Sequence, residues 1–150
     1  MKSAISFILI LLFVTVFAVS CAQNESRLQD GYYTAEAAEF DDFGWKEFVT
    51  VFVNNGKIVT VEYNAKNASG FIKSWDMDYM RTMNAADGTY PNEYTRYYAS
   101  QFLDLQSSDG VDAMTGATHS YHTFLQLADA VIAKAAVGDT TVALVEFAQE

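Results

Sequence analysis

The turn at Asn54-Asn55-Gly56 most constrains the fold, because it joins two segments rich in β-branched and aromatic residues, 45–53 and 57–63. Both central residues of a type I′ turn need a positive φ, which Asn and Gly adopt at little cost. The pattern therefore predicts an antiparallel β-hairpin, preceded by a strand that begins near Tyr32. We expect the charged side chains of this hairpin to lie at its rim, namely Lys46, Glu47 and Glu62.

The C-terminal part of the chain carries the clearest helical pattern. Its apolar residues follow the i, i+3, i+4, i+7 template, and Gly138 is suited to end the helix. These residues are Phe124, Leu127, Ala128, Val131, Ile132, Ala135 and Ala136. We expect the helix to begin at or just after Thr118 and residues 140–147 to form a last strand. This order of elements predicts an α+β fold, a small mixed domain in which helices pack on an antiparallel hairpin sheet.

Two shorter helices are predicted between the hairpin and the C-terminal helix. Ser74 is the expected N-cap of the first, which Asp87-Gly88 would end. Its apolar residues recur every four positions, at Trp75, Tyr79 and Met83. The second helix spans about 92–105, with a stripe made of Tyr94, Tyr97, Tyr98, Phe102 and Leu105. We interpret these tyrosines as core residues with hydroxyls at the edge of the core, and cofactor stacking is the alternative.

The first twenty residues are typical of an export signal. Lys2 precedes an uncharged run from Ile5 to Ala18, which as a helix would span roughly 21 Å, short of the roughly 30 Å hydrocarbon core of a bilayer. Ala18-Val19-Ser20-Cys21 resembles a bacterial lipobox, with Ala where Leu is usual. The sequence thus predicts a lipoprotein signal peptide over 1–20 and a lipid-modified Cys21. An ordinary secretory signal and an uncleaved anchor are the alternatives, and all three place the chain outside the cytoplasm.

The remaining chain divides into a polar tether and one folded domain. Residues 21–30 show no periodicity and are predicted to be a lipid-anchored tether, and residues 31–150 are predicted to form the domain. The single cysteine excludes an internal disulfide, and no Cys/His pattern of a structural zinc site is present, so we predict no metal site.

The charge of the chain is strongly acidic. Lys and Arg number 9 against 19 Asp and Glu, a net charge of -10, and loss of the signal peptide with Lys2 makes it -11. Such a surface repels the phosphate backbone and excludes nucleic acid as a partner. It also lacks a basic patch for anionic lipid, so the lipid chains must hold the protein on the bacterial membrane.

The segment from Asp112 to Ser120 combines small and hydroxylated residues and directly precedes the predicted C-terminal helix. The free N–H groups and the positive dipole end of a helix start can bind an anion, and Gly116 and Ala117 would let a phosphate approach the backbone. The simpler interpretation is a capping turn.

This segment resembles the flavinylation motif of the FMN-binding domain family, Asp-x-x-(Ser/Thr)-Gly-Ala-Thr followed one residue later by Ser or Thr. The fixed positions match at Asp112, Thr115, Gly116, Ala117, Thr118 and Ser120. Asp30-Gly31-Tyr32-Tyr33, the hairpin and the C-terminal helix occur in the same order as in that family, so the resemblance covers roughly residues 30–137. Thr115 stands where Ser is commoner, and Ser120 replaces the usual Thr.

The family occurs in the flavin subunits of sodium-pumping NADH:quinone oxidoreductase, in Rnf-type complexes and in exported lipoproteins. The resemblance implies that FMN is joined to Thr118 through a phosphoester bond. It also implies that a separate flavin transferase, with FAD as donor and magnesium, makes this bond and recognises Asp112, Thr115, Gly116 and Ala117. No residue of this chain is then catalytic. The implied function is extracytoplasmic electron transfer with a membrane redox complex or other electron carriers.

Several other residues are candidates for contact with the flavin. Trp45, Tyr121 and Met114 are candidates for ring contact, and core or loop packing is the alternative. His119 and His122 are candidates for proton donation to a reduced flavin, because histidine titrates near neutral pH. Their alternative interpretation is as ordinary surface residues.

Two other functions remain open. A hydrolase would use Thr118 or Ser120 as nucleophile with a histidine base, but only Thr118 and His122 have a spacing that lets them meet on one helix face, and no oxyanion hole is evident. The second alternative is a non-redox, membrane-anchored surface lipoprotein, a binding module or antigen that retains the FMN-binding fold without flavin.

Overall fold

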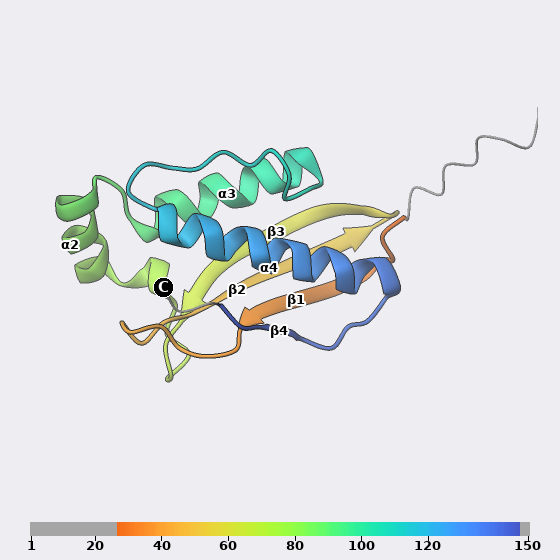
Figure 1. Cartoon of the computed structure of the whole chain (residues 1–150), viewed down its shortest axis with the longest axis horizontal. Helices are drawn as coiled ribbons and strands as arrows, with labels where there is room; N and C mark the ends of the chain where they lie inside the picture. Colours follow the sequence, from red (N-terminus) through yellow and green to blue (C-terminus); the bar gives the residue numbers. More distant parts are fainter. Residues whose placement is uncertain (1–26, 148–150) are drawn as a thin grey trace, which may run out of the picture.

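The computed structural model describes residues 27–147, so the predicted signal peptide, Cys21 and most of the tether lie outside the described residues. A four-stranded sheet of order β3-β2-β1-β4 forms one layer, and α3 and α4 lie against it (Figure 1). This confirms the predicted α+β class and its C-terminal helix. In chain order the elements are β1 Gly31–Ala37, β2 Lys46–Asn54, β3 Lys57–Lys66, η2 Lys73–Trp75, α2 Met77–Asp87, α3 Pro91–Leu105, α4 Thr118–Val137 and β4 Ala143–Val145.

The predicted hairpin is present as β2 and β3. Asn55 and Gly56 have φ values of 55° and 75°, as a type I′ turn requires. β1 pairs with β2 in antiparallel orientation, whereas β4 pairs with β1 in parallel, with Ala35 opposite Ala143. The hairpin therefore forms one side of the sheet, and the two ends of the described chain form the other.

The core lies between the sheet and the two long helices. Alternate residues of β2 face the helices, and Val49, Val51 and Val53 are fully buried there. An aromatic cluster fills the space under α3 and α4, made of Tyr63, Tyr94, Tyr98, Phe102 and Phe124. Burial of each such side chain contributes about 1.5–3 kcal/mol. Tyr97 and Leu105 differ from the predicted stripe, because they are 36% and 46% exposed.

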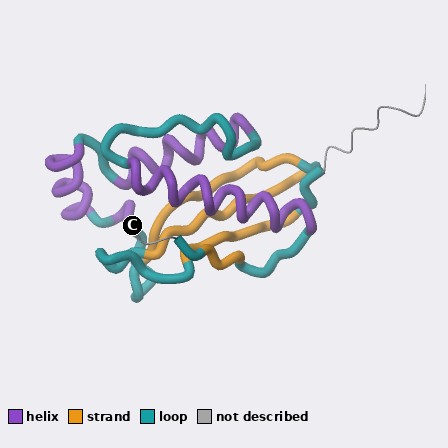
Figure 2. Tube along the Cα trace, in the orientation of Figure 1, coloured by secondary structure: helices purple, strands orange, loops and turns teal. Residues whose placement is uncertain are grey.

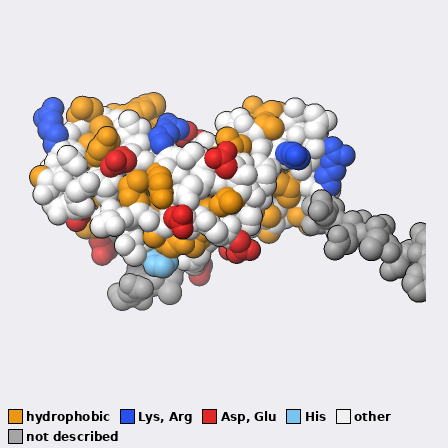
Figure 3. Space-filling model, turned by 90° about the horizontal axis from the view of Figure 1, so that it is seen from above, with side chains coloured by type: hydrophobic (Ala, Val, Ile, Leu, Met, Phe, Trp, Pro, Cys, Tyr) orange, Lys and Arg blue, Asp and Glu red, His pale blue; other side chains and the backbone are white. Residues whose placement is uncertain are grey.

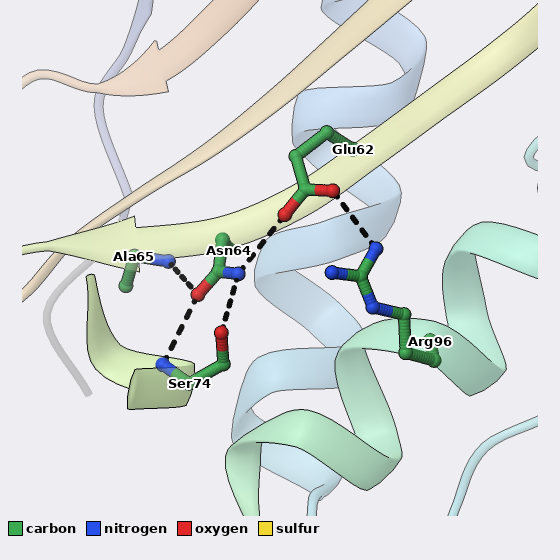
Figure 4. Close-up of polar contacts among 5 residues, drawn as sticks. All are labelled: Glu62, Asn64, Ala65, Ser74 and Arg96. Carbon is green, nitrogen blue, oxygen red and sulfur yellow. Dashed lines mark hydrogen bonds and ion pairs between the residues drawn. The ribbon is translucent and has the colours of Figure 1, made fainter. Parts of the chain in front are cut away.

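The start of α2 differs from the prediction. Its N-cap is Asp76, whose carboxylate accepts a hydrogen bond from Tyr79 N at 2.9 Å. Ser74 lies earlier, in η2, where its Oγ accepts a hydrogen bond from Asn64 Nδ2 at 2.9 Å (Figure 4). Trp75 is 66% exposed, and α2 contains no buried residue. Ser74, which the sequence pattern predicted as the N-cap, thus binds Asn64 of β3 instead.

Figure 4 also shows how β3 is joined to α3. Asn64 Nδ2 donates to Glu62 Oε1 at 3.0 Å, and Arg96 of α3 donates to Glu62 Oε2 at 2.8 Å. Glu62 therefore lies at the rim of the sheet, as the sequence predicts. This network fixes η2, β3 and α3 relative to one another.

The last strand is shorter than the predicted 140–147. Residues before it form a turn in which Asp139 Oδ1 accepts from Thr141 N at 2.9 Å, and Lys134 Nζ contacts Asp139 Oδ2 at 2.5 Å. The chain leaves α4 at Gly138, which has a φ of 71°, and then enters this turn. Only Ala143–Val145 then pairs with β1.

The long connection between α3 and α4 positions the candidate site. In Figure 2 this loop, residues 106–117, runs back along the helix layer to the end where α3 begins, and α4 starts there. The motif therefore lies beside α2, the N-terminal part of α3 and the first residues of β2.

Candidate functional site

Thr118 is the first residue of α4, as the sequence predicts, and Ala117 is its N-cap. The first hydrogen bond of the helix runs from Tyr121 N to Ala117 O at 2.9 Å. The N–H groups of the preceding three residues therefore have no partner within the helix. They form the positive end of the helix dipole, next to the Thr118 side chain.

The side chains of Asp112, Thr115 and Thr118 are exposed. Within residues 27–147 none of the three makes a side-chain hydrogen bond to another residue. They follow one another at three-residue spacing along the motif. These three fixed positions of the motif are thus available to another molecule.

Gly116 and Ala117 instead determine the backbone of the motif. Gly116 has a φ of 85°, and a Cβ there would lie 2.2 Å from the Asp87 carbonyl oxygen at the end of α2. Ala117 is buried, and its carbonyl accepts a hydrogen bond from Tyr98 Oη at 3.2 Å. A side chain at position 116 is therefore excluded by close packing against α2.

Hydrogen bonds from α3 and α4 hold the rest of the motif backbone. Met114 N donates to Tyr98 Oη at 3.1 Å, and Asp112 N donates to Gln101 Oε1 at 2.8 Å. Tyr121 Oη donates to the carbonyl of Val111 at 2.9 Å. The exposed side chains are consequently presented from a fixed backbone.

Glu47 was expected at the rim, but the structure buries it, with 7% of its surface exposed. Ser120 Oγ donates to Glu47 Oε1 at 3.2 Å, and Tyr63 Oη donates to the Ser120 carbonyl at 2.9 Å. Glu47 Oε2 has no hydrogen-bond partner within residues 27–147. The alternation of β2 contains the missed signal, because Glu47 has the same parity as Val49 and the other buried valines.

Burial shifts the pKa values of Glu47 and of the titratable residues around it. Burial raises the pKa of Glu47, and the nearby charge of Lys73 only partly opposes it. Burial would lower the pKa of Lys73, but its neighbours Tyr94 and Glu47 outweigh this effect and raise it. Burial also raises the pKa of Tyr94 to about 12. The buried Glu47 carboxyl group therefore lies beneath the first turn of α4, and the buried ammonium group of Lys73 acts on it from η2.

The three candidates for ring contact all have packing roles. Trp45 is 6% exposed and packs edge-on against Tyr79, with ring centroids 5.9 Å apart. Met114 Sδ accepts from Thr89 Oγ1 at 3.2 Å, and the Tyr121 hydroxyl is bound to the backbone. These contacts agree with the packing alternative for each of them.

The two histidines are exposed on α4. Within the described chain, neither histidine side chain is hydrogen-bonded to Thr118 or Ser120, and Ser120 is already bound to Glu47. This arrangement gives no support to a serine or threonine nucleophile with a histidine base. Residues 27–147 also contain no group of three His, Cys, Asp or Glu placed to hold a metal ion, and no helix there is long and apolar enough to cross a membrane.

Comparison with known proteins assigns the chain to a family. Over 114 residues it is 37% identical to the 15 kDa lipoprotein of Treponema pallidum, covering 76% of this chain and 81% of that protein. The chain belongs to the family of this lipoprotein. The match supports a lipid-anchored, membrane-associated protein, and the lipid on Cys21 stays a prediction. No protein-family model matches the chain.

Two solved structures share the fold of this chain. The crystal structure of the CPE2226 protein from Clostridium perfringens has a TM-score of 0.77 and 38% identity, and the match covers 81% of this chain and 99% of that one. A solution NMR structure from Clostridium thermocellum has a TM-score of 0.50 and 28% identity, with 72% and 92% covered. The names of these two proteins state no activity.

Proposed function

We propose that the protein is an extracytoplasmic, lipid-anchored electron carrier with FMN attached through a phosphoester bond to Thr118. A separate FAD-dependent flavin transferase makes the bond. The observation that carries this proposal is the complete motif from Asp112 to Ser120, whose acceptor hydroxyl is exposed at the first residue of α4. The resemblance to the FMN-binding domain family supplies the chemistry.

The residues present fit such a group. Thr118 has a free and exposed hydroxyl, and the N–H groups of the first turn of α4 offset part of the phosphodiester charge, by about 0.3–1 kcal/mol. Asp112 and Thr115 are exposed and available to the transferase. Gly116 and Ala117 act indirectly, since they shape the backbone that presents the other three side chains.

The residues of this chain hold and expose the flavin rather than react. Bound FMN supplies reversible one- and two-electron transfer, and the protein determines its position and surroundings. Tyr98 and Gln101 fix the motif backbone, while Ser120 joins the first turn of α4 to β2. The electron donor and acceptor are other molecules, a membrane redox complex or other electron carriers.

A covalent bond suits an exported protein with this charge. Outside the cytoplasm a domain has no access to the cytoplasmic FMN pool, and a surface of charge -11 would hold an anionic phosphate weakly. Covalent attachment removes loss by dilution. The proposal thus accounts for an exposed acceptor residue in an acidic domain.

The test is to coexpress the full chain with an active flavin transferase in a bacterium that processes lipoproteins. A denaturing gel should show flavin fluorescence in the protein band, and Thr118→Ala should abolish it. Thr82→Ala removes an exposed hydroxyl of α2 and should leave the band fluorescent. A fluorescent band in Thr118→Ala would place the bond elsewhere. A dark wild-type band, while a known acceptor is labelled in the same cells, would favour the non-redox surface lipoprotein.

A further inference from the structure

The described chain enters the domain at one end of the sheet, which we call the entry end. Gln29 N donates to the Ala135 carbonyl near the end of α4 at 2.9 Å. Arg27 Nη2 donates to the Asn55 carbonyl at 2.6 Å, and Gly56 N donates to Asp30 Oδ1 at 2.9 Å. The tip of the hairpin and the C-terminal turn of α4 are therefore fixed to the last residues of the predicted tether, so residues 27–30 are part of the folded domain rather than a free linker.

Thr118 lies at the opposite end, which we call the site end. It is the first residue of α4, whereas Ala135 is near its last turn, and a rise of 1.5 Å per residue separates them by about 26 Å. Figure 1 shows α4 running along the sheet, with its start far from the point where the described chain begins. Glu47, bound to Ser120, is likewise at the end of β2 remote from the hairpin turn.

The distance to a lipid on Cys21 is limited by the sequence. Residues 22–26 separate Cys21 from Arg27, so six Cα steps span about 21 Å at most when fully extended. This keeps the entry end near the lipid surface. Thr118 could approach the same surface only if the domain lay flat on it, or if a fully extended tether let the domain tip its site end down.

The charge along the helix layer opposes a flat orientation. Residues 97–133 contain no Lys or Arg but four acidic residues, Asp104, Asp109, Asp112 and Asp129. In Figure 3, which views the molecule from above, acidic side chains lie over the left and middle parts of the molecule, and basic side chains are visible in the middle and at both ends. Asp87, whose carbonyl contacts Gly116, adds an exposed acid beside the motif. An anionic membrane would repel this surface, whereas a cationic protein would be attracted to it.

We propose that the lipid anchor and Thr118 lie at opposite ends of the domain, so that the site end faces the aqueous phase and serves a water-soluble, positively charged protein partner rather than a quinone in the bilayer. The orientation depends on the lipid at Cys21, on the fold and on the acidic charge of the helix layer, and it does not depend on a bound flavin. The assignment of the partner as an electron carrier rests on the proposed function.

The orientation can be tested without flavin. Val137 is 70% exposed near the entry end and His122 is exposed near the site end, so Val137→Cys and His122→Cys each provide one free thiol in the lipidated chain. Each variant is labelled with a donor dye and placed in vesicles that contain an acceptor-labelled lipid. We expect about twofold greater energy transfer at position 137, because about 22 Å of helix separates the two positions. Equal transfer, or greater transfer at position 122, would overturn the proposal.

The partner class is tested with the flavinylated protein in the same vesicles. After reduction, its oxidation is followed with cationic cytochrome c in solution and, separately, with menaquinone in the bilayer. We expect faster oxidation by the cytochrome, falling about tenfold from low to high ionic strength. Ferricyanide, an anionic control, should react faster as salt is added. Faster oxidation by menaquinone would overturn the partner class. A chain that never carries flavin would instead contradict the proposed function, and the dye measurement would still decide the orientation.

Discussion

The Glu47 carboxylate accepts a hydrogen bond from the Ser120 hydroxyl at 3.2 Å, and this contact joins the second residue of β2 to the first turn of α4. Tyr63 donates to the carbonyl of the same serine. The last fixed position of the motif is therefore buried and bound, two residues after an exposed acceptor. This position therefore has a structural role in the site.

Ser120→Ala should lower the free energy of unfolding by about 1–3 kcal/mol, because it leaves a buried carboxylate oxygen of Glu47 unpaired. Urea denaturation measures this loss. Ser100→Ala, which removes an exposed hydroxyl bound to a backbone carbonyl of its own helix, should change the stability by less than about 0.5 kcal/mol. Flavin labelling at saturating transferase should persist in Ser120→Ala. Unchanged stability would show that the buried contact is not formed in solution.

Glu47→Gln should change how stability depends on pH. The pKa of Glu47 is raised in the folded protein above its ordinary value of 4.5, so the folded state binds this proton more tightly than the unfolded state does. The stability that this proton contributes is then fully present below pH 4.5 and is lost as the pH rises through the folded pKa of Glu47. The Gln variant has no such loss.

Thermal unfolding from pH 4 to 8 measures this effect. The Tm of Glu47→Gln minus the Tm of wild type should increase as the pH rises. The increase is about 4–8 °C for each kcal/mol of stability that wild type loses relative to the variant. The charged and titratable groups around Glu47 are Lys73, Tyr63, Tyr94 and His119. Both proteins are also compared in a His119→Gln background, so that a charge change at this neighbour cannot account for the difference. A Tm difference independent of pH would contradict the burial of a titrating carboxyl.

Gly116→Ala should destabilise the domain by more than about 3 kcal/mol, since its Cβ would overlap the Asp87 carbonyl and its φ is positive. Gly88→Ala is the matched control, because Gly88 has a φ of 76° but no atom within 4 Å of an added Cβ. That variant should lose only about 1 kcal/mol from backbone strain. Equal losses measured by chemical denaturation would mean that α2 is not packed against the motif.

Tyr98→Phe should loosen the motif, because its hydroxyl accepts from Met114 N and donates to the Ala117 carbonyl. The loss of stability should be about 1–2 kcal/mol. Hydrogen exchange should show faster exchange at the Met114 amide. Tyr97→Phe, on the half-exposed neighbour, should leave exchange at Met114 unchanged. Faster exchange in both variants would indicate a general effect of tyrosine removal.

Asp112→Asn should slow flavin attachment without unfolding the domain. Its carboxylate is exposed and makes no side-chain hydrogen bond within the described chain, so stability should change by less than about 0.5 kcal/mol. The initial rate of labelling by a limiting amount of transferase should fall about tenfold or more, as expected when a buried charged contact with the transferase is lost. Asp104→Asn is a matched exposed control in α3. An unchanged rate would remove Asp112 from the transferase contact.

Local sequence was sufficient where neighbouring residues determine the conformation. Asn55-Gly56 predicts the turn because both residues tolerate positive φ, and the structure has positive φ at both. The periodicity that ends at Gly138 predicts α4, since its apolar residues recur with the period of a helix that packs one face on a core. The motif and its candidate acceptor Thr118 were also visible in the sequence.

Local sequence was insufficient where a distant residue competes for a side chain. Ser74 has the chemistry of an N-cap, but Asn64 uses its hydroxyl, and Asp76 caps the helix. Glu47 has the chemistry of a rim residue, yet its strand parity and Ser120 place it in the core. Short-range preferences are worth about 1 kcal/mol, so one buried hydrogen bond is enough to override them.

The sequence by itself determined the α+β class, the hairpin, the last helix and the identity of the six motif positions. Only the tertiary structure decided which of those positions face solvent and which hold the backbone, because this depends on the approach of α2 to Gly116 and of β2 to Ser120. The tertiary structure alone also placed Thr118 and the start of the domain at opposite ends of α4. The physical reason is that close packing between elements distant in the chain has no signature in a local pattern.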